Sequence, residues 1–270
     1  MTGIEQIAAA FAGHGKRAAL MPYLMAGFPD LDSSRRIGLA AADAGADLLE
    51  LGVPFSDPLA DGPMIHMAGT RALEAGVHTA EVLALARELA PAAPLVLMCY
   101  ANPILARGVE RFADELAAAG ASGLIVPDLP LEEAPAVAGA CEDRGLALVP
   151  LVAPTTPDDR LEAIGRRARG FLYAVSLLGT TGERHGLADS FASVVARAAA
   201  HTDVPVAVGF GIATGAHAAE AARAGADGVI VGSRLIRAAA EAHDRGEDPA
   251  PSVGAVVEEL AAALATEPSR

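Results

Sequence analysis

Short apolar runs alternate along the chain with longer stretches in which apolar residues recur at helical spacing. The runs show no polar–apolar alternation, which is typical of strands buried on both faces of a parallel sheet. Eight runs are predicted as strands: Ala19–Met25, Asp47–Leu51, Leu95–Cys99, Gly123–Val126, Ala147–Leu151, Phe171–Val175, Val204–Val208 and Gly228–Val231. The stretches between them, predicted as helices, include Ser33–Asp43, Thr79–Leu89, Val109–Ala119, Pro130–Ala140 and Phe191–Ala200.

A weak internal repeat supports this alternation of helices and strands. Three predicted strands follow similar tetrapeptides, namely Ala44–Asp47, Ala119–Ser122 and Ala224–Asp227. In each copy glycine stands where a helix ends and the chain turns tightly, a position that favours left-handed backbone. Eight strand–helix units of roughly 25–35 residues fit a (β/α)8 barrel of about 250 residues.

We therefore predict an α/β fold, a (β/α)8 TIM barrel that forms a single domain over residues 1–270. An extra N-terminal helix at Ile4–Ala12 is expected to cap the bottom of the barrel. The alternative is an open doubly wound sheet, whose first turn normally carries a glycine-rich phosphate loop. Here the first predicted strand is followed by Ala26-Gly27-Phe28-Pro29, which favours the barrel.

Composition narrows the class of protein. The mean hydropathy of +0.35 is high, but the most apolar stretch, Ala92–Ala101, is about half a membrane-spanning helix and contains Pro94. The segment Met1–Ala12 carries no Lys or Arg, unlike a secretory signal, so we expect a cytoplasmic protein. The net charge of −14 argues against binding to nucleic acid or to an anionic membrane.

Cysteine and lysine are too scarce for several kinds of site. Cys99 and Cys141 are the only two cysteines, which excludes a disulfide scaffold or a four-thiolate zinc site. Lys16 is the single lysine, and its neighbours Gly15 and Arg17 suggest a solvent-exposed position. Because an imine-forming aldolase needs a buried, activated lysine, the sequence disfavours that mechanism.

Reactive groups of a barrel lie at the carboxyl ends of its strands. Glu50 lies inside an apolar run, where burial should raise its pKa and suit it to acid–base work. Asp57 and Asp61 follow in a loop rich in Pro and Gly, where they either accept backbone hydrogen bonds in turns or pair with Glu50 in catalysis. A divalent-metal site is the competing interpretation, but it lacks a third convergent ligand beyond His66, so no metal is expected.

The late strand ends are rich in glycine and predict a phosphate site. Gly179–Gly182, Gly209–Gly211 and Gly232-Ser233 follow the last three predicted strands. Barrel phosphate sites use backbone N–H groups of such loops together with a helix N-terminus, and Ser233 can add a hydroxyl. The stretch Leu177–Asp189 is predicted to form a lid, in which His185 is interpreted as a solvated loop residue.

These motifs closely resemble the tryptophan synthase alpha chain family. The resemblance is most specific in Glu50–Pro63, and it extends in order over nearly the whole chain. It continues through Tyr100–Pro103, Val126–Pro130, Tyr173–Gly182, Gly209–Ile212 and Gly232-Ser233. It implies a lyase that cleaves indole-3-glycerol phosphate to indole and D-glyceraldehyde 3-phosphate by a retro-aldol reaction, without a metal or a lysine imine.

The resemblance also implies roles for individual residues. Glu50 corresponds to the acid/base at the bond that breaks, and Asp61 to the carboxylate that hydrogen-bonds the indole N–H. The substrate pocket would contain Tyr23, Tyr100, Tyr173 and Thr181, and the phosphate would be bound by Gly182, Gly211, Gly232 and Ser233. Leu177 departs from the family, in which arginine is frequent at this position.

A beta chain that carries pyridoxal phosphate is the partner that the resemblance implies, in an α2β2 complex. This chain itself is then expected to hold no cofactor. Asp57, Asn102 and Pro103 correspond to the family's interface with that partner. Three alternatives remain open, namely a stand-alone indole-3-glycerol-phosphate lyase, another phosphosugar barrel enzyme, and a non-catalytic subunit that activates its partner.

Overall fold

The computed structural model describes residues 1–175, 187–209 and 211–265, and its strands form one parallel sheet. The sheet order is β5-β4-β3-β2-β1-β9-β8-β7-β6. The strands are β1 (Ala19–Met25), β2 (Leu49–Gly52), β3 (Leu95–Met98), β4 (Gly123–Ile125), β5 (Ala147–Val149), β6 (Leu151–Val152), β7 (Leu172–Val175), β8 (Val206–Gly209) and β9 (Gly228–Val231). They match the eight predicted runs with small differences at the ends.

The fifth predicted strand is the one that closes the barrel. Pro150 divides it into β5, which pairs with β4, and β6, which pairs with β7. Proline has no N–H to donate to a neighbouring strand, but the Pro150 carbonyl still accepts a hydrogen bond of 3.0 Å from the Tyr173 N–H. The nine strands therefore make up an eight-stranded TIM barrel in which one strand is interrupted.

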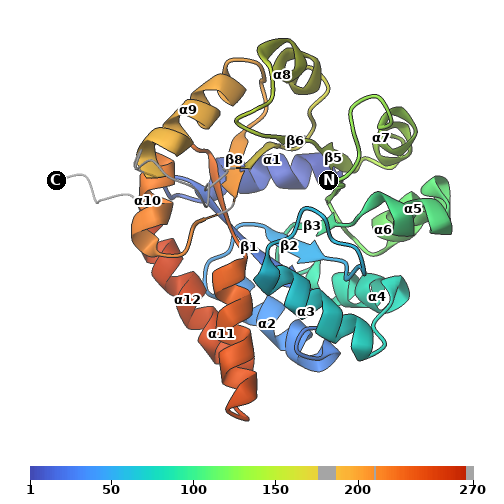
Figure 1. The fold of residues 1–270 in the computed structure, drawn as a ribbon, viewed down its shortest axis with the longest axis vertical. Coiled ribbons are helices and arrows are strands. Elements are labelled where there is room, and N and C mark those ends of the chain that lie inside the picture. Colours follow the sequence, from blue (N-terminus) through green and yellow to red (C-terminus); the bar gives the residue numbers. More distant parts are fainter. Residues whose placement is uncertain (176–186, 210, 266–270) are drawn as a thin grey trace.

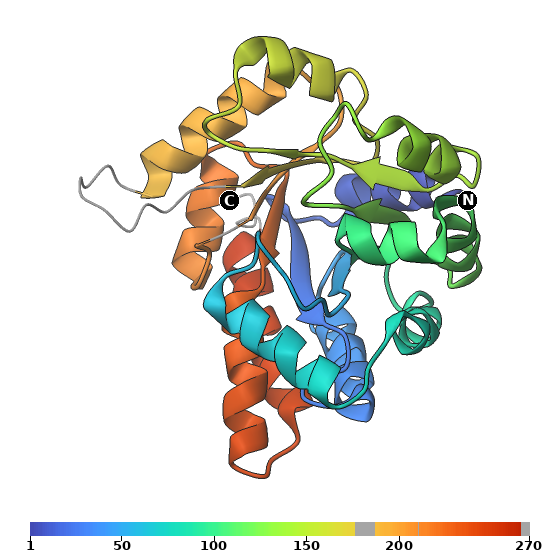
Figure 2. The same cartoon turned by 45° about the vertical axis from the view of Figure 1, so that its right-hand side comes forward.

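Helices surround the strands (Figure 1), and the view in Figure 2 shows the same arrangement after a rotation of 45°. They are α1 (Gly3–Gly13), α2 (Leu31–Asp43), α3 (Pro63–Glu74), α4 (Thr79–Leu89), α5 (Ala101–Arg107), α6 (Val109–Ala118), α7 (Pro135–Glu142), α8 (Asp158–Gly165), α9 (Leu187–Ala199), α10 (Gly215–Arg223), α11 (Ser233–Asp244) and α12 (Pro249–Leu264). The largest difference from the sequence prediction is α7, which begins at Pro135 rather than at Pro130. The residues after Pro130 form a turn closed by the Glu133 N–H, and Pro135 suits the first position of a helix.

Helix α1 covers the amino ends of the strands, as the sequence predicted. A capping box formed by Thr2 and Glu5 starts the helix, and the helix residue Ile7 is fully buried. The Ser122 hydroxyl, just before β4, donates a hydrogen bond of 2.6 Å to Gln6. One end of the barrel is therefore closed by packing, and the carboxyl ends of the strands remain for a functional site.

The prediction that Lys16 is exposed is wrong. Its ammonium lies 2.7 Å from an Asp47 carboxylate oxygen and donates a hydrogen bond of 2.7 Å to the Gly45 carbonyl, and only 13% of the side chain is exposed. The backbone N–H of Arg17 donates a hydrogen bond to the Leu264 carbonyl, which holds the end of α12 beside Lys16. Lys16 thus ties chain segments together at the amino ends of the strands, so its role is structural.

Candidate active site

Glu50 is the only charged residue that is buried in the part of the chain that the structure describes. Strand β2 places it opposite Tyr23 on β1 and Val96 on β3. No described residue offers a hydrogen-bond partner to either carboxyl oxygen. Burial, with a smaller contribution from the charge of Asp61, raises the pKa of Glu50 to about 8. At neutral pH the group is therefore mostly protonated, which suits it to donate a proton.

Asp61 ends the loop that follows β2, immediately before α3. Its backbone N–H donates to the Pro58 carbonyl, and Gly62 and Pro63 then begin the helix. Partial burial raises the pKa of Asp61 to about 6, while a hydrogen bond from Tyr100 and the nearby His66 oppose that rise. Asp61 is therefore mostly ionised at pH 7, in contrast to Glu50.

Tyr100 positions Asp61 through two hydrogen bonds at one hydroxyl. The hydroxyl donates to the Asp61 carboxylate and accepts a bond of 3.0 Å from the Ala60 N–H. The ring stacks on Phe55 with centroids 5.1 Å apart, which fixes its orientation. Tyr100 is absent from the lining of the cavity described below, so it reaches the site through Asp61.

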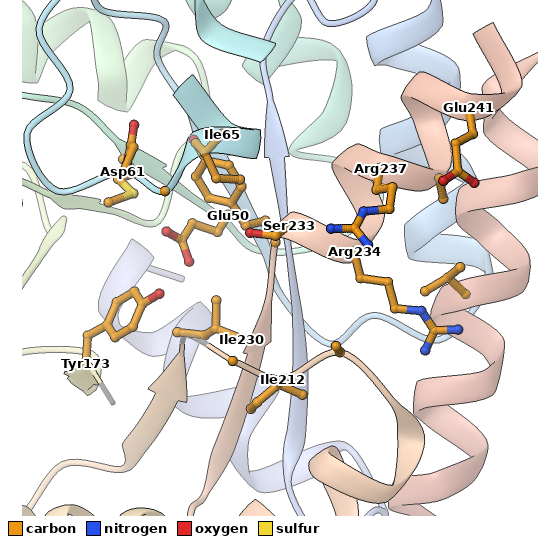
Figure 3. Close-up of a pocket in the computed structure, with 18 residues that line it drawn as sticks. Glu50, Asp61, Ile65, Tyr173, Ile212, Ile230, Ser233, Arg234, Arg237 and Glu241 are labelled. Carbon is orange, nitrogen blue, oxygen red and sulfur yellow. The ribbon is translucent and has the colours of Figure 1, made fainter. Parts of the chain in front are cut away.

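A cavity of about 530 Å³ contains both carboxylates (Figure 3). Tyr23 and Tyr173 contribute to its wall, so all three tyrosines of the chain lie around Glu50 and Asp61. Burial, followed by the charges of the two carboxylates, raises the pKa of both Tyr23 and Tyr173 well above the usual value. These hydroxyls therefore stay protonated and can act as hydrogen-bond donors in the cavity.

Two glycines at strand ends make room for these tyrosines. A Cβ atom on Gly52 would lie 2.0 Å from the Tyr23 hydroxyl, and a Cβ atom on Gly209 would lie 2.3 Å from the Tyr173 hydroxyl. Such distances are far shorter than a van der Waals contact, so no larger residue fits beside these rings. Gly209, predicted as part of a phosphate loop, therefore also has this packing role.

The predicted phosphate loops reach the same cavity. Gly211, Gly232 and Ser233 line it, and the backbone of Gly211 is left-handed with φ of +81°. Ser233 is the first residue of α11 and Gly232 is its N-cap, so the start of this helix faces the cavity. Leu177, Thr181, Gly182 and His185 lie outside the described residues. So does the predicted lid up to residue 186, whereas its last residues, 187–189, begin helix α9.

The residues assigned to a partner interface lie apart from the cavity. Asp57 and Asn102 are exposed, and Pro103 is partly buried. Two large apolar side chains close to these residues in sequence lie in solvent: Leu59 in the loop after β2 is 92% exposed, and Leu105 on α5 is 62% exposed. These two leucines were not predicted, because the exposure of a single apolar residue depends on how the surrounding elements pack. Large apolar side chains left in solvent beside Asp57 and Pro103 are candidates for burial by a partner protein.

Two arginines on α11 were also missed. Arg234 and Arg237 both line the cavity, close to Ser233 in sequence. Arg234 is held by Glu259 of α12 through a bidentate ion pair of 3.0 and 2.6 Å. Arg237 follows Ser233 by four residues, a spacing that places both on one face of a helix and could have indicated it.

Two further features concern the described residues as a whole. These residues contain no group of three His, Cys, Asp or Glu side chains placed to bind a metal ion. Within the same ranges, no helix is both long enough and apolar enough to cross a membrane.

The fold and the site together define a (β/α)8 barrel whose cavity holds two carboxylates with separated pKa values, an arrangement typical of acid–base enzymes. The comparison with family models matches residues 10–265 to the family described as "Tryptophan synthase alpha chain". The chain belongs to this family. It is accordingly a lyase of the alpha reaction of tryptophan synthase, an enzyme of tryptophan biosynthesis.

Individual relatives agree with this assignment. The chain is 50% identical to a tryptophan synthase alpha chain of Synechococcus elongatus over 238 residues, which cover 87% of this chain and 89% of the relative. It is 50% identical over 232 residues to the alpha chain of Methanosarcina mazei, covering 86% of this chain and 85% of that one.

Solved structures show the same fold. One chain of Mycobacterium tuberculosis tryptophan synthase superposes with a TM-score of 0.87 at 39% identity, covering 97% of this chain and 99% of that chain. The alpha subunit from Legionella pneumophila superposes with a TM-score of 0.88 at 36% identity, covering 98% of both chains.

Proposed function

We propose that the chain cleaves indole-3-glycerol phosphate to indole and D-glyceraldehyde 3-phosphate with Glu50 and Asp61 as its catalytic residues. The observation that carries this proposal is the state of Glu50. Its carboxyl is fully buried, lacks a hydrogen-bond partner among the described residues and faces a cavity that also holds Asp61. A buried carboxyl without a partner is costly unless a substrate supplies the missing contacts.

The reaction requires one proton to arrive and one to leave. A proton must be delivered to C3 of the indole, and the hydroxyl on the adjacent glycerol carbon must lose its proton. As that hydroxyl becomes a carbonyl, the electrons of the broken carbon–carbon bond return to the ring. Glu50, with its pKa of about 8, can donate the first proton and as a carboxylate accept the second, which restores its starting state.

Asp61 stabilises the charge that forms between these steps. Protonation at C3 leaves a positive charge on the indole ring, and an ionised carboxylate at the ring N–H offsets that charge in a site shielded from water. The pKa of Asp61, about 6, keeps it ionised at neutral pH. Because Glu50 is neutral under the same conditions, the two groups do not compete for one proton.

The phosphate group of the substrate would bind at Gly211, Gly232 and Ser233. Backbone N–H groups and the start of α11 supply positive partial charge there. Gly182 is proposed as a further member of this site on the resemblance alone. The pocket for the indole ring is proposed to include Tyr23, Tyr173 and Thr181, the last again on the resemblance alone.

A beta chain is the proposed partner. The family works with such a chain, and we infer an α2β2 complex in which the beta chain holds pyridoxal phosphate and this chain holds no cofactor. The exposed leucines beside Asp57 and Pro103 support a contact at this end of the barrel. A cytoplasmic location is part of the same proposal.

A substrate screen tests the proposal. Indole release from indole-3-glycerol phosphate is measured beside turnover of ribulose and triose phosphates, with and without a beta chain. We expect turnover of the indole substrate alone. Glu50→Gln and Asp61→Asn should each lower it by about three orders of magnitude or more, while circular dichroism shows an intact fold. Near-normal turnover by Glu50→Gln would contradict its role, and turnover of another phosphosugar would favour the alternative barrel enzyme.

A further inference from the structure

One cationic side chain in the cavity has no part in the proposed mechanism. Arg237 lies on α11, one helical turn beyond Ser233, and both line the cavity that contains Glu50 and Asp61. In the view of Figure 3 the guanidinium of Arg237 lies toward Ser233, whereas Arg234 points away from it. The side chain of Arg237 is exposed, so its charge is not penalised by burial.

The two arginines of this helix differ in what they contact. Arg234 is occupied by Glu259, which also accepts the Gly215 N–H at the start of α10 at 3.4 Å. Arg237 has no side-chain hydrogen bond or ion pair with any described residue, even though Glu241 lies one turn further along the helix. Five guanidinium N–H donors are therefore available at the edge of the cavity.

An unpaired cation in this cavity can offset the negative charge that a phosphorylated substrate meets there. At neutral pH the ionised Asp61 and the carboxylate of Glu241 place negative charge in the cavity, and the chain as a whole carries a net charge of −14. A substrate phosphate brings about two further negative charges, while the N–H groups of Gly232 and Ser233 supply only partial positive charge. A guanidinium presents paired donors that match two phosphate oxygens, which a helix terminus alone does not.

We propose that Arg237 is a specificity-determining residue that binds the phosphate group of the substrate from the side of α11. This inference rests on the proposed function, because it assigns the phosphate of that substrate to the Ser233 end of the cavity. Arg234 acts differently, since its ion pair holds α11 against α12. Arg237 then selects phosphorylated over unphosphorylated substrates without taking part in proton transfer.

The test compares Arg237→Gln and Arg237→Lys with a control, Arg223→Gln, on an exposed arginine of α10 that does not line the cavity. Steady-state kinetics use indole-3-glycerol phosphate and unphosphorylated indole-3-glycerol. Calorimetry measures the dissociation constant of sn-glycerol 3-phosphate. For Arg237→Gln we expect KM for the phosphorylated substrate and this dissociation constant to rise about fivefold, with kcat nearly unchanged.

The remaining variants and conditions sharpen the expectation. Arg237→Lys should lie between the wild type and Arg237→Gln, because a point charge replaces the planar fork. Arg223→Gln and all measurements with the unphosphorylated substrate should be unchanged. The effect should shrink as salt is raised from about 0.05 to 0.5 M, since an exposed charge is screened. Thermal unfolding should be the same for all variants.

Two outcomes would overturn the inference. One is equal affinity of the wild type and Arg237→Gln for sn-glycerol 3-phosphate, and the other is a loss of kcat without a change in KM. The calorimetric result does not depend on turnover. A wild type that binds sn-glycerol 3-phosphate through Arg237 but does not cleave indole-3-glycerol phosphate would disprove the proposed function and leave this inference standing.

Discussion

At the scale of single residues, the site depends on two carboxyl groups in unequal surroundings. Glu50 is fully buried and unpartnered among the described residues, and its pKa rises to about 8. Asp61 is more open and accepts a bond from Tyr100, which limits its pKa to about 6. The same side-chain chemistry thus yields a neutral acid and an ionised carboxylate at pH 7, because burial and hydrogen bonding act on them to different extents.

This inequality predicts a bell-shaped dependence of kcat/KM on pH. Activity should rise as Asp61 ionises near pH 6 and fall as Glu50 loses its proton near pH 8. Tyr100→Phe keeps the ring on Phe55 but removes the donor to Asp61. The pKa of Asp61 should then rise, so that the acid limb moves upward by about one pH unit, as measured by pH-rate profiles of indole release.

A matched variant shows whether the shift of the acid limb is specific to Tyr100 or follows the loss of any tyrosine hydroxyl near Asp61. Tyr173→Phe also removes a buried hydroxyl, but Tyr173 is not a hydrogen-bond donor to Asp61. Its acid limb should stay where it is in the wild type. An acid limb that does not move in Tyr100→Phe would show that Tyr100 does not control the ionisation of Asp61.

At the scale of elements, strand ends and helix starts bring the reactive groups together. Strands β1 and β2 pair with Tyr23 opposite Glu50, so both side chains reach the same cavity. The start of α11 brings Ser233 to the other side of that cavity. The spacing of these elements depends on close packing, in which Gly52 leaves space for the Tyr23 ring.

Gly52→Ala should therefore destabilise the fold, because its new methyl group overlaps the Tyr23 hydroxyl. We expect a loss of about 1–3 kcal/mol in the free energy of unfolding, measured by urea denaturation. The control is Gly139→Ala on α7, where a Cβ would meet nothing within 4 Å. That change should be neutral or stabilise the helix by about 0.5–1 kcal/mol. Equal stability of the two variants would contradict the packing argument.

At the scale of the whole molecule, the two ends of the barrel serve different purposes. The amino ends are closed by α1 and tied by the Lys16–Asp47 pair, both partners being largely buried. The carboxyl ends hold the cavity and the exposed side chains of Leu59, in the loop after β2, and Leu105, on α5 after β3. Stability and function are thus separated along the barrel axis, as is typical of this fold.

Leu59→Ser should weaken the proposed contact with a beta chain. Truncating an apolar side chain at an interface removes burial that only the complex provides, so the concentration of beta chain needed for half-maximal activation should rise about tenfold. Cleavage by the isolated chain should not change. Ala12→Ser, an exposed position on α1 at the opposite end, serves as the control. Activation curves that coincide for the wild type and Leu59→Ser would exclude Leu59 from the interface.

Much of the fold could be predicted because it is encoded locally. Apolar runs, helical spacing and the glycine-containing tetrapeptides predict eight strand–helix units, and Pro150 inside the fifth run alters only its pairing. Glu50 could be identified because a carboxylate inside an apolar run is exceptional whatever the surrounding fold. The order of these signals along the chain determined the fold class. Together with the glycines near Ser233, it also indicated the carboxylate side and the phosphate side of the cavity.

Only the tertiary structure decided how distant segments use their side chains. Lys16 is largely shielded from solvent because the Asp47 carboxylate and the Gly45 carbonyl come to it from another part of the chain. Tyr100 holds Asp61, and Arg237 faces the cavity while Arg234 is paired with Glu259. Such contacts join residues far apart in sequence, and closure of the barrel sets their distances. A periodic pattern specifies which elements form, whereas burial, pKa values and ion pairs follow from how those elements pack.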